Sequence, residues 1–376
     1  MDEKYLNIVS FNVPYPPNYG GAIDVFYKLK SLAENNVKII LHTFDYGRGY
    51  ASELEKYCTE VHYYKRKTGI FSQLSALPYI VISRKNKDLL INLQKNNYPI
   101  LFEGLHTCYY LAHPSLKNRL KMVRIHNIEH YYYKGLSENA RSPFLRTYFS
   151  IEASKLKKYE KQLRHADYLL VLSSTEQVYF EENYGKQKTI YVPLFFQDEK
   201  IDSKSSNIQP YVLFHGDLST PENINAASFL IQSVVSKDAT ISWIFAGLNP
   251  SKSLLRLAEK YHNVTIKGNL SKEDLSQLLS NACVNILYTN QVSGVKLKLL
   301  NALFNGQYCL ANQEMVNGSG LEDLCTIISD NPDEILAAIK KCFQEKLQDG
   351  ELIKRMNTFN ELYNNQKNAL IIRNLL

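Results

Sequence analysis

Short apolar runs alternate with amphipathic stretches along almost the whole chain. Helical patterns such as 22–34, 251–261 and 271–282 separate the runs, and Ser251 and Ser271 stand where helix N-caps are expected. Strands that alternate with helices predict parallel sheets with helices on both faces. The runs predicted as strands are 6–13, 37–44, 98–104, 121–127, 167–173, 189–193, 211–216, 240–247, 263–268, 283–288, 307–311 and 325–329.

This alternation stops at 196–210, a polar, Ser-rich stretch that Pro210 closes. Such a composition indicates a linker. We therefore expect an α/β fold of two Rossmann-like domains, 1–195 and 211–357, and a C-terminal helix at about 358–376 that packs back onto the first domain. Open parallel sheets bind ligands beyond the carboxyl ends of their strands, so we expect the site in a cleft where the two domains face each other.

The composition is that of a folded protein: of 376 residues, 45% are hydrophobic and 22% charged. It excludes a largely disordered, collagen-like or coiled-coil chain. No apolar run reaches the roughly 20 residues of a membrane span, and the N-terminus lacks the pattern of a signal peptide. We expect a cytoplasmic protein whose six scattered cysteines are reduced and form neither a disulfide framework nor a zinc site.

Positive charge is concentrated in the first half. Residues 1–200 hold 28 Lys/Arg against 20 Asp/Glu, whereas residues 201–376 hold 16 against 17. Within the first half, Arg141–Arg164 has seven Lys/Arg and two Glu among several aromatic residues. This stretch is either an ordinary amphipathic surface helix or a helix that lies on an anionic membrane, on its inner face. We recognise no nucleic-acid-binding module, so nucleic acid is not an expected partner.

Two segments have the composition of anion-binding loops. Gly20 and Gly21 follow the first strand, where they form either a simple tight turn or a backbone approach for an anion at a helix N-terminus. In the second half, a loop with Ser293 and Gly294 precedes a helix predicted to begin near Val295.

Two lysines, Lys296 and Lys298, fall in the first turn of that predicted helix, where the helix dipole disfavours cations. A phosphate or diphosphate bound between them would explain the placement. The alternative is two solvated lysines on a helix that packs through its leucines. Dinucleotide, Walker, zinc-protease and serine-hydrolase motifs are absent.

The order of several segments resembles that of retaining nucleotide-sugar glycosyltransferases with the GT-B fold, glycosyltransferase family 4. "SGVKLKLLNALFNGQYCLA" (293–311) resembles the donor-binding stretch of that family, and "FHGDLSTPENINAASFLI" (214–231) the opening of its second domain. "YPPNYGGAIDVFYKLKSLA" (15–33) resembles its Gly-Gly loop, and "VRIHNIEHYYYKGL" (123–136) its His-Asn-x-Glu segment. The resemblance extends over nearly the whole chain.

The resemblance implies sugar transfer from a nucleoside diphosphate sugar to a glycan or lipid-linked acceptor. Retention of configuration, no metal or other cofactor, and a role in cell-surface polysaccharide or lipopolysaccharide biosynthesis are implied with it. By this resemblance, the donor is bound by Gly20, Gly21, Gly216, Gly268, Asn269, Ser293, Gly294, Val295, Lys296, Lys298 and Asn301.

On the acceptor side, the resemblance places His126 nearest the chemistry. Glu129 would be a second catalytic residue, and Glu103 and Asn127 would contact the acceptor. The alternatives are a structural histidine at 126, a solvated or capping carboxylate at 129, and a plain turn at Gly268 and Asn269.

Three departures from the family pattern bear on activity. Ser293 and Asn301 stand where the family often has two glutamates, and Asp217 and Glu222 stand near the usual diphosphate-clamping Arg and Lys. A catalytically degenerate protein that binds a sugar nucleotide or a partner is therefore an alternative. A sugar-nucleotide epimerase is less favoured, because it would need carboxylates around the donor sugar.

Overall fold

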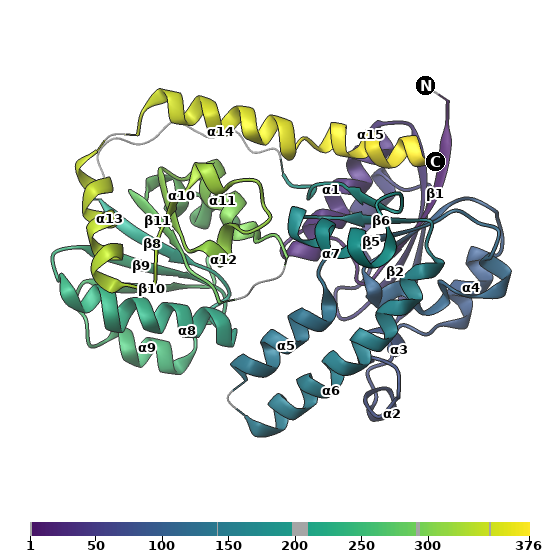
Figure 1. Ribbon diagram of the computed structural model, residues 1–376, viewed down its shortest axis with the longest axis horizontal. Helices are drawn as coiled ribbons and strands as arrows, with labels where there is room; N and C mark the ends of the chain where they lie inside the picture. Colours follow the sequence, from purple (N-terminus) through teal and green to yellow (C-terminus); the bar gives the residue numbers. More distant parts are fainter. Residues whose placement is uncertain (1, 141, 198–209, 291–293, 346) are drawn as a thin grey trace. The chain divides into compact units, whose positions relative to one another are not determined.

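The computed structural model describes residues 2–140, 142–197, 210–290, 294–345 and 347–376, with only the backbone of Ile70 and Phe71. The chain forms two compact units. Unit 1 comprises Met1–Gln197 with Glu361–Leu376, and unit 2 comprises Asp198–Asn360. Most of the expected linker, 198–209, lies outside the described residues. Figure 1 shows the helices and strands of both units.

Unit 1 is built on a seven-stranded parallel sheet in the order β3-β2-β1-β4-β5-β6-β7. The apolar runs of the sequence form its strands, since side chains of a strand with helices on both faces are buried on both sides. The strands are β1 (Lys4–Ser10), β2 (Val37–Asp45), β3 (Glu60–Lys65), β4 (Ile100–Glu103), β5 (Lys121–Ile125), β6 (Tyr168–Val171) and β7 (Thr189–Tyr191).

Helices cover both faces of this sheet. On one face, Leu6 and Ile8 of β1 pack with Leu29 and Ile372. On the other face, Val9 belongs to a core that includes Leu156. The helices of unit 1 are α1 (Gly20–Glu34), α2 (Ile70–Gln73), α3 (Tyr79–Ile82), α4 (Lys87–Leu93), α5 (Glu129–Asn139), α6 (Pro143–Tyr159), α7 (Ser174–Tyr184) and α15 (Asn365–Leu375).

The C-terminal helix α15 lies beside α1 in unit 1 (Figure 1). Arg373 donates from Nε to the carbonyl oxygen of Asn35 at 2.9 Å, and Asn365 exchanges two hydrogen bonds with the backbone of Phe196. Ala369 and Ile372 are fully buried in the core of this unit. Sixteen residues distant in sequence therefore complete one face of unit 1.

Unit 2 contains a six-stranded parallel sheet in the order β10-β9-β8-β11-β12-β13. Its strands are β8 (Tyr211–His215), β9 (Ser242–Gly247), β10 (Val264–Gly268), β11 (Val284–Leu287), β12 (Tyr308–Ala311) and β13 (Thr326–Ile327). Its helices are α8 (Pro221–Phe229), α9 (Lys252–Ala258), α10 (Lys272–Asn281), α11 (Leu297–Asn305), α12 (Gln313–Val316), α13 (Pro332–Gln344) and α14 (Asp349–Leu362), whose last residues enter unit 1.

Twelve predicted strands correspond to strands of the structure, and the α/β class is confirmed. Ser251 and Ser271 cap their helices as expected. The helix after the donor loop begins at Leu297, not near Val295, so Lys296 is its N-cap residue and only Lys298 lies in its first turn. Strand β3 was not predicted, because at the sheet edge its side chains are mostly half-exposed and polar.

Candidate functional site

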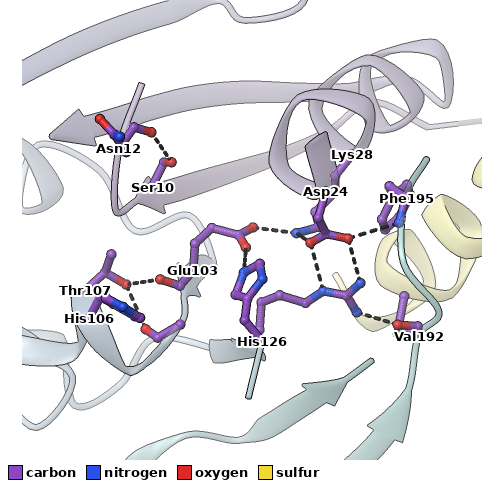
Figure 2. Close-up of polar contacts among 12 residues, drawn as sticks. Ser10, Asn12, Asp24, Lys28, Glu103, His106, Thr107, His126, Val192 and Phe195 are labelled. Carbon is purple, nitrogen blue, oxygen red and sulfur yellow. Dashed lines mark hydrogen bonds and ion pairs between the residues drawn. The ribbon is translucent and has the colours of Figure 1, made fainter. Parts of the chain in front are cut away.

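Unit 1 contains a chain of buried charges that ends at the carboxyl ends of β4 and β5 (Figure 2). Asp24 of α1 accepts hydrogen bonds from both Lys28, at 2.8 Å, and Arg124, at 2.8 and 3.1 Å. Lys28 continues to Glu103 Oε1 at 2.7 Å, and Glu103 Oε2 meets His126 Nε2 at 3.0 Å. Except for His126, these side chains are fully buried.

Opposite charges compensate each other in this chain. Burial alone would raise the pKa of Asp24, but Arg124 and Lys28 outweigh it and hold that pKa well below its usual range. Burial likewise opposes ionisation of Glu103, yet Lys28 and His126 lower its pKa. Both carboxyl groups therefore stay ionised, and the network fixes the ring of His126.

The three potential metal ligands Asp24, Glu103 and His126 lie within 4.8 Å of one another. Two cations, Lys28 and Arg124, already occupy the carboxylate oxygens of this group. A divalent metal at the same place would have to displace them against electrostatic repulsion. The cluster is therefore built as an ion-pair network and does not fit a metal ion.

The ring of His126 remains partly accessible, with 11% of its side chain exposed. Gly104 follows β4 with a φ of 68°, and a Cβ there would come within 2.8 Å of His106 Nδ1 and 3.6 Å of His126 Cδ2. A glycine thus permits both histidines to approach one backbone position. Phe11 packs against both rings, with centroid distances of 5.3 and 5.4 Å.

Glu129 begins α5 next to this pair, and its Oε1 is buried with no hydrogen-bond partner among the described residues. His106 Nδ1 is equally unpaired and lies 3.8 Å from that oxygen. Burial raises the pKa of Glu129 to about 8, although Arg84 and Asn127 oppose the shift. Burial and the charge of Arg84 hold the pKa of His106 well below its usual value. Glu129 thus retains its proton at neutral pH.

Gly20 and Gly21 form the first turn of α1, whose N-cap residue is Tyr19. Neither glycine has a positive φ. A Cβ on Gly21 would come within 2.4 Å of Phe11 Cζ, so packing requires glycine here rather than a strained backbone. The first amides of α1 have no partner one turn earlier within the helix, which is the geometry that suits an anion.

In unit 2, the strand order reverses between β8 and β11, and a crevice at such a switch point is where open α/β sheets bind ligands. Lys298 of α11 lies there. Its Nζ donates to Asn223 Oδ1 at 3.2 Å and to the Tyr288 carbonyl oxygen at 3.5 Å, and it stands 5.5 Å from the centre of the Phe214 ring. Burial lowers the pKa of Lys298 to about 8, while Glu222 opposes the shift.

Apart from Gly20 and Gly21, the predicted donor residues belong to unit 2. Gly294 has a φ of 77°, and Lys296 donates from Nζ to its carbonyl oxygen at 2.7 Å. Val295 precedes the cap and is half-buried, as is Asn301 on α11. Ser293 lies outside the described residues.

Gly216 follows β8 and touches the amide of Asn223, which a Cβ would approach to 2.9 Å. Gly268 ends β10 against the ring of Pro250, at 2.7 Å from an added Cβ. Asn269 has a φ of 54°, and its Oδ1 accepts from the Asn249 amide at 2.8 Å. Both strand ends are therefore shaped by close packing, and Asn269 holds the neighbouring loop.

The two acids noted near the usual phosphate clamp have partners of their own. Thr289 donates to Glu222 Oε1, and Asp217 accepts from the amide and hydroxyl of Ser219. Glu222 also acts on Lys298, since it raises the pKa of that lysine. A bound diphosphate would therefore meet one lysine whose charge is partly offset.

Sequence reasoning missed two features. The Asp24–Lys28–Arg124 network joins residues 100 positions apart, and each charge alone is typical of a protein surface. His215, at the end of β8, is buried with neither ring nitrogen paired among the described residues. The sequence signal for it was a histidine that closes an otherwise apolar strand.

Helices α5 and α6 lie side by side (Figure 1). The apolar side chains that α6 exposes are Phe144 (78%), Leu145 (44%) and Ile151 (51%). Exposed cations follow along the same stretch, and among its described residues only Lys155 pairs with an acid, Glu152, at 2.8 Å. Arg141 lies outside the described residues. Within those residues, no helix is long and apolar enough to cross a membrane.

No protein-family model matches the chain. A Klebsiella pneumoniae protein described as a 44.6 kDa protein in the cps region is 27% identical, over 88% of each chain. Among solved structures, Anabaena HepE in complex with UDP-glucose has a TM-score of 0.69 at 12% identity and covers 99% of this chain and 100% of its own.

Two further solved structures are similar to this chain over almost its whole length. TarM has a TM-score of 0.65 at 13% identity, covering 100% of this chain and 99% of its own. The UDP-forming α,α-trehalose-phosphate synthase from Burkholderia xenovorans has a TM-score of 0.62 at 9% identity, covering 99% of both chains. At such identities the likeness establishes the fold alone: two parallel sheets with helices, the α/β fold that GT-B glycosyltransferases share.

Proposed function

We propose that this protein is a glycosyltransferase that moves a sugar from a nucleoside diphosphate sugar to a glycan or lipid-linked acceptor. The observation that carries the proposal is the Lys298 ammonium group, which side-chain and backbone oxygens hold at the switch point of the unit 2 sheet. Burial lowers the pKa of Lys298, so its positive charge is incompletely compensated. A lysine of this kind at the switch point suits a site that binds an anion.

In this proposal the diphosphate lies against Lys298 and the N-terminus of α11, with Lys296 beside it. Both cations and backbone amides stabilise the negative charge that the leaving diphosphate gains as the sugar departs. Gly216 and Gly294 let the donor approach the backbone, and Asn301 offers a neutral side chain to the ribose. Gly268 and Asn269 face the nucleobase.

On the acceptor side, the proposal gives His126 and Glu129 the roles nearest the chemistry. Glu103 has both oxygens bonded, to Lys28 and His126, so we assign it to positioning His126 and not to direct contact with a sugar. Asn127 contacts the acceptor beside Glu129, and Gly20 and Gly21 offer amides to the donor phosphates. In this proposal transfer needs no metal, because cations and amides supply the charge stabilisation. Retention of configuration is proposed from the family resemblance alone.

The biological context that we propose is cell-surface polysaccharide biosynthesis, supported by the relative from a cps region. We further propose that α6 lies on the inner, anionic face of a membrane and brings the protein to a lipid-linked acceptor. Three exposed apolar side chains support this, together with Lys157 and Lys158, which form no ion pair within the described residues, since amphipathic surfaces with both features bind anionic lipid.

A thermal-shift panel of UDP-, GDP-, ADP- and TDP-sugars tests the donor site. We expect one nucleotide class to stabilise the protein and Lys298→Ala to abolish that stabilisation. Lys252→Ala is the matched control, because Lys252 also occupies the first turn of a unit 2 helix but is exposed. If none of the nucleotides stabilises the wild-type protein, the proposal fails.

A second candidate is a protein that binds the donor without transferring it. The observations in its favour are Glu222 beside Lys298 and the neutral Asn301 in place of a carboxylate. Slow hydrolysis of the bound donor separates the two functions. Release of free sugar that His126→Asn reduces roughly a hundredfold supports the transferase, in line with the usual loss of a general acid–base or positioning group. Binding with no turnover supports the second candidate.

A further inference from the structure

His215 combines deep burial with a lack of hydrogen bonds. It ends β8 and is 3% exposed, and among the described residues neither Nδ1 nor Nε2 has a partner. A buried polar atom left unpaired costs free energy, so most such atoms in proteins have a partner. The two nitrogens of His215 therefore mark a place where a bound molecule can supply the missing partner.

His42 in unit 1 provides the contrast. It is also fully buried, but its Nδ1 meets the Tyr64 hydroxyl at 2.9 Å and its Nε2 meets Asn7 Oδ1 at 3.1 Å. The pKa of each histidine is lowered to about 3, mainly by burial. Burial thus lowers the pKa of both rings, but among the described residues only His42 has a hydrogen-bond partner at each ring nitrogen.

His215 lies at the carboxyl end of β8, at the switch point of the sheet where we propose that the donor binds. Val212 and Phe214 of β8 pack into the core with α8, so His215, one residue further along a strand, points to the opposite face. Tyr211, also on that face, bonds Leu278 of α10.

The charged group that acts on His215 is Lys298 of α11. The charge of Lys298 on α11 reaches the ring and lowers its pKa, after the larger effect of burial. Glu222 on α8 in turn faces Lys298. A ligand bound beside Lys298 therefore also acts on His215.

We propose that His215 is a donor-binding residue that takes up one proton from solvent when a nucleoside diphosphate sugar binds beside Lys298. This inference rests on the proposed function of that site. The diphosphate offsets the charge of Lys298 and adds negative charge nearby, and both changes favour the imidazolium form. The protonated ring has two N–H donors, which can bond phosphoryl oxygens.

Proton uptake links donor affinity to pH. A group that binds a proton only in the complex makes the affinity rise as the pH falls, by up to about tenfold per pH unit. Lys298 has a pKa of about 8 in the free protein, so it contributes to uptake near pH 8 but already carries its proton at pH 6. Measurements at pH 6 therefore exclude a contribution from Lys298, and the His215→Gln variant identifies the share of His215.

Titration calorimetry with UDP-glucose at pH 6, in two buffers of different ionisation enthalpy, measures the number of protons taken up. Both phosphates of UDP-glucose are diesters, so the ligand itself does not titrate there. His215→Gln keeps an N–H donor of similar reach but cannot be protonated. His262→Gln is the control, an exposed histidine of the same unit.

We expect roughly half a proton or more to be taken up per UDP-glucose by the wild type and by His262→Gln, and close to none by His215→Gln. If the wild type binds UDP-glucose without proton uptake, the inference is wrong and the proposed function is unaffected. The same holds if His215→Gln has an unchanged thermal midpoint and takes up as many protons as the wild type. If neither UDP-glucose nor any other sugar nucleotide of the panel binds, it is the proposed function that fails.

Discussion

Glu103 and Glu129 are two buried carboxyl groups near His126 and His106, and their surroundings drive their pKa values apart. Glu103 is ionised because Lys28 and His126 bond both of its oxygens. Glu129 keeps a proton because burial is not compensated at Oε1. Two carboxyl groups separated in this way suit different roles, one that holds a charge and one that donates a proton.

The raised pKa of Glu129 predicts a pH-dependent stability. Between the ordinary value of 4.5 and about 8, the unfolded chain releases a proton that the folded protein retains. Stability therefore falls as the pH rises through this window, by up to about 5 kcal/mol. Glu129→Gln removes the dependence, so its thermal midpoint should exceed that of the wild type at pH 8 and approach it at pH 4.5.

Thermal melts of both proteins across this pH range check the prediction. Histidines with lowered pKa values, among them His42, His106 and His215, destabilise the fold at acid pH in both proteins. The comparison is therefore read between pH 6.5 and 8, where these histidines are largely neutral in both the folded and the unfolded chain. A difference in midpoint that is constant with pH would show that Glu129 does not titrate as described.

The charge of Glu222 predicts a gain of affinity at the proposed donor site. Its charge stands near Lys298 and would repel a diphosphate. Glu222→Gln should strengthen the binding of UDP-glucose at pH 6 roughly three- to tenfold, because about 1 kcal/mol of repulsion is removed. Glu273→Gln, a change of an exposed acid in the first turn of α10, should leave the affinity unchanged in the same calorimetric titration. Weaker binding by Glu222→Gln would mean that Glu222 positions Thr289 or Lys298.

Individual site residues differed in how far the sequence predicted them. His126 directly follows β5 and Glu129 begins the next helix, and ligands bind at the carboxyl ends of parallel strands, so periodicity and the family resemblance both pointed to these two candidates. Lys298 was proposed from the pair of lysines at the start of α11. The network of Asp24 and Arg124 could not be predicted, since only the fold brings α1 and β5 together. His215 was missed because one histidine after four apolar residues resembles a simple strand end.

At the level of elements, α6 carries the surface that we propose to bind a membrane. It exposes Phe144, Leu145 and Ile151 on the same stretch as Lys157 and Lys158, which form no ion pair with described residues. Lys157→Gln with Lys158→Gln should weaken binding to vesicles that contain phosphatidylglycerol roughly tenfold or more, since each cation near an anionic surface contributes about 1 kcal/mol.

Vesicle sedimentation at two salt concentrations measures this effect. Phe144→Ser with Leu145→Ser should weaken binding at both concentrations, because apolar burial is not screened by salt. Leu255→Ser is the control, a leucine of α9 that is 41% exposed in unit 2. Wild-type protein that stays in the supernatant with anionic vesicles would contradict the membrane proposal.

The hydrophobic pattern of the chain predicted most elements but not all of their boundaries. Twelve strands were located because apolar runs buried on both faces are continuous in sequence. β3 was not, because an edge strand with exposed polar side chains has no such run. The start of α11 differed by two residues, since Val295 and Leu297 are both apolar and no side chain caps the helix.

At the scale of the whole molecule, α15 ties a distant part of the chain into unit 1. Ile372 is fully buried, so Ile372→Ala should destabilise unit 1 by about 2–5 kcal/mol. Ile353→Ala should have little effect, because Ile353 on α14 is 58% exposed. Trp243, the single tryptophan, is buried in β9 and reports on unit 2 alone.

Denaturation followed by circular dichroism and by tryptophan fluorescence separates the units. We expect Ile372→Ala to shift an early transition seen by circular dichroism and to leave the fluorescence transition of Trp243 unchanged. An equal shift of both signals would indicate that the units unfold together and that α15 does not stabilise unit 1 alone.

Because unit 1 contains both Met1–Gln197 and Glu361–Leu376, the chain cannot complete it in the order in which it is synthesised. At 5–20 residues per second, the ribosome needs roughly 10–30 s to make unit 2 before α15 emerges. Throughout that time the surface later covered by Ala369 and Ile372 stays open. A nascent chain released early would thus carry an unfinished first unit, which the chaperones and proteases of the cell can distinguish from a finished one.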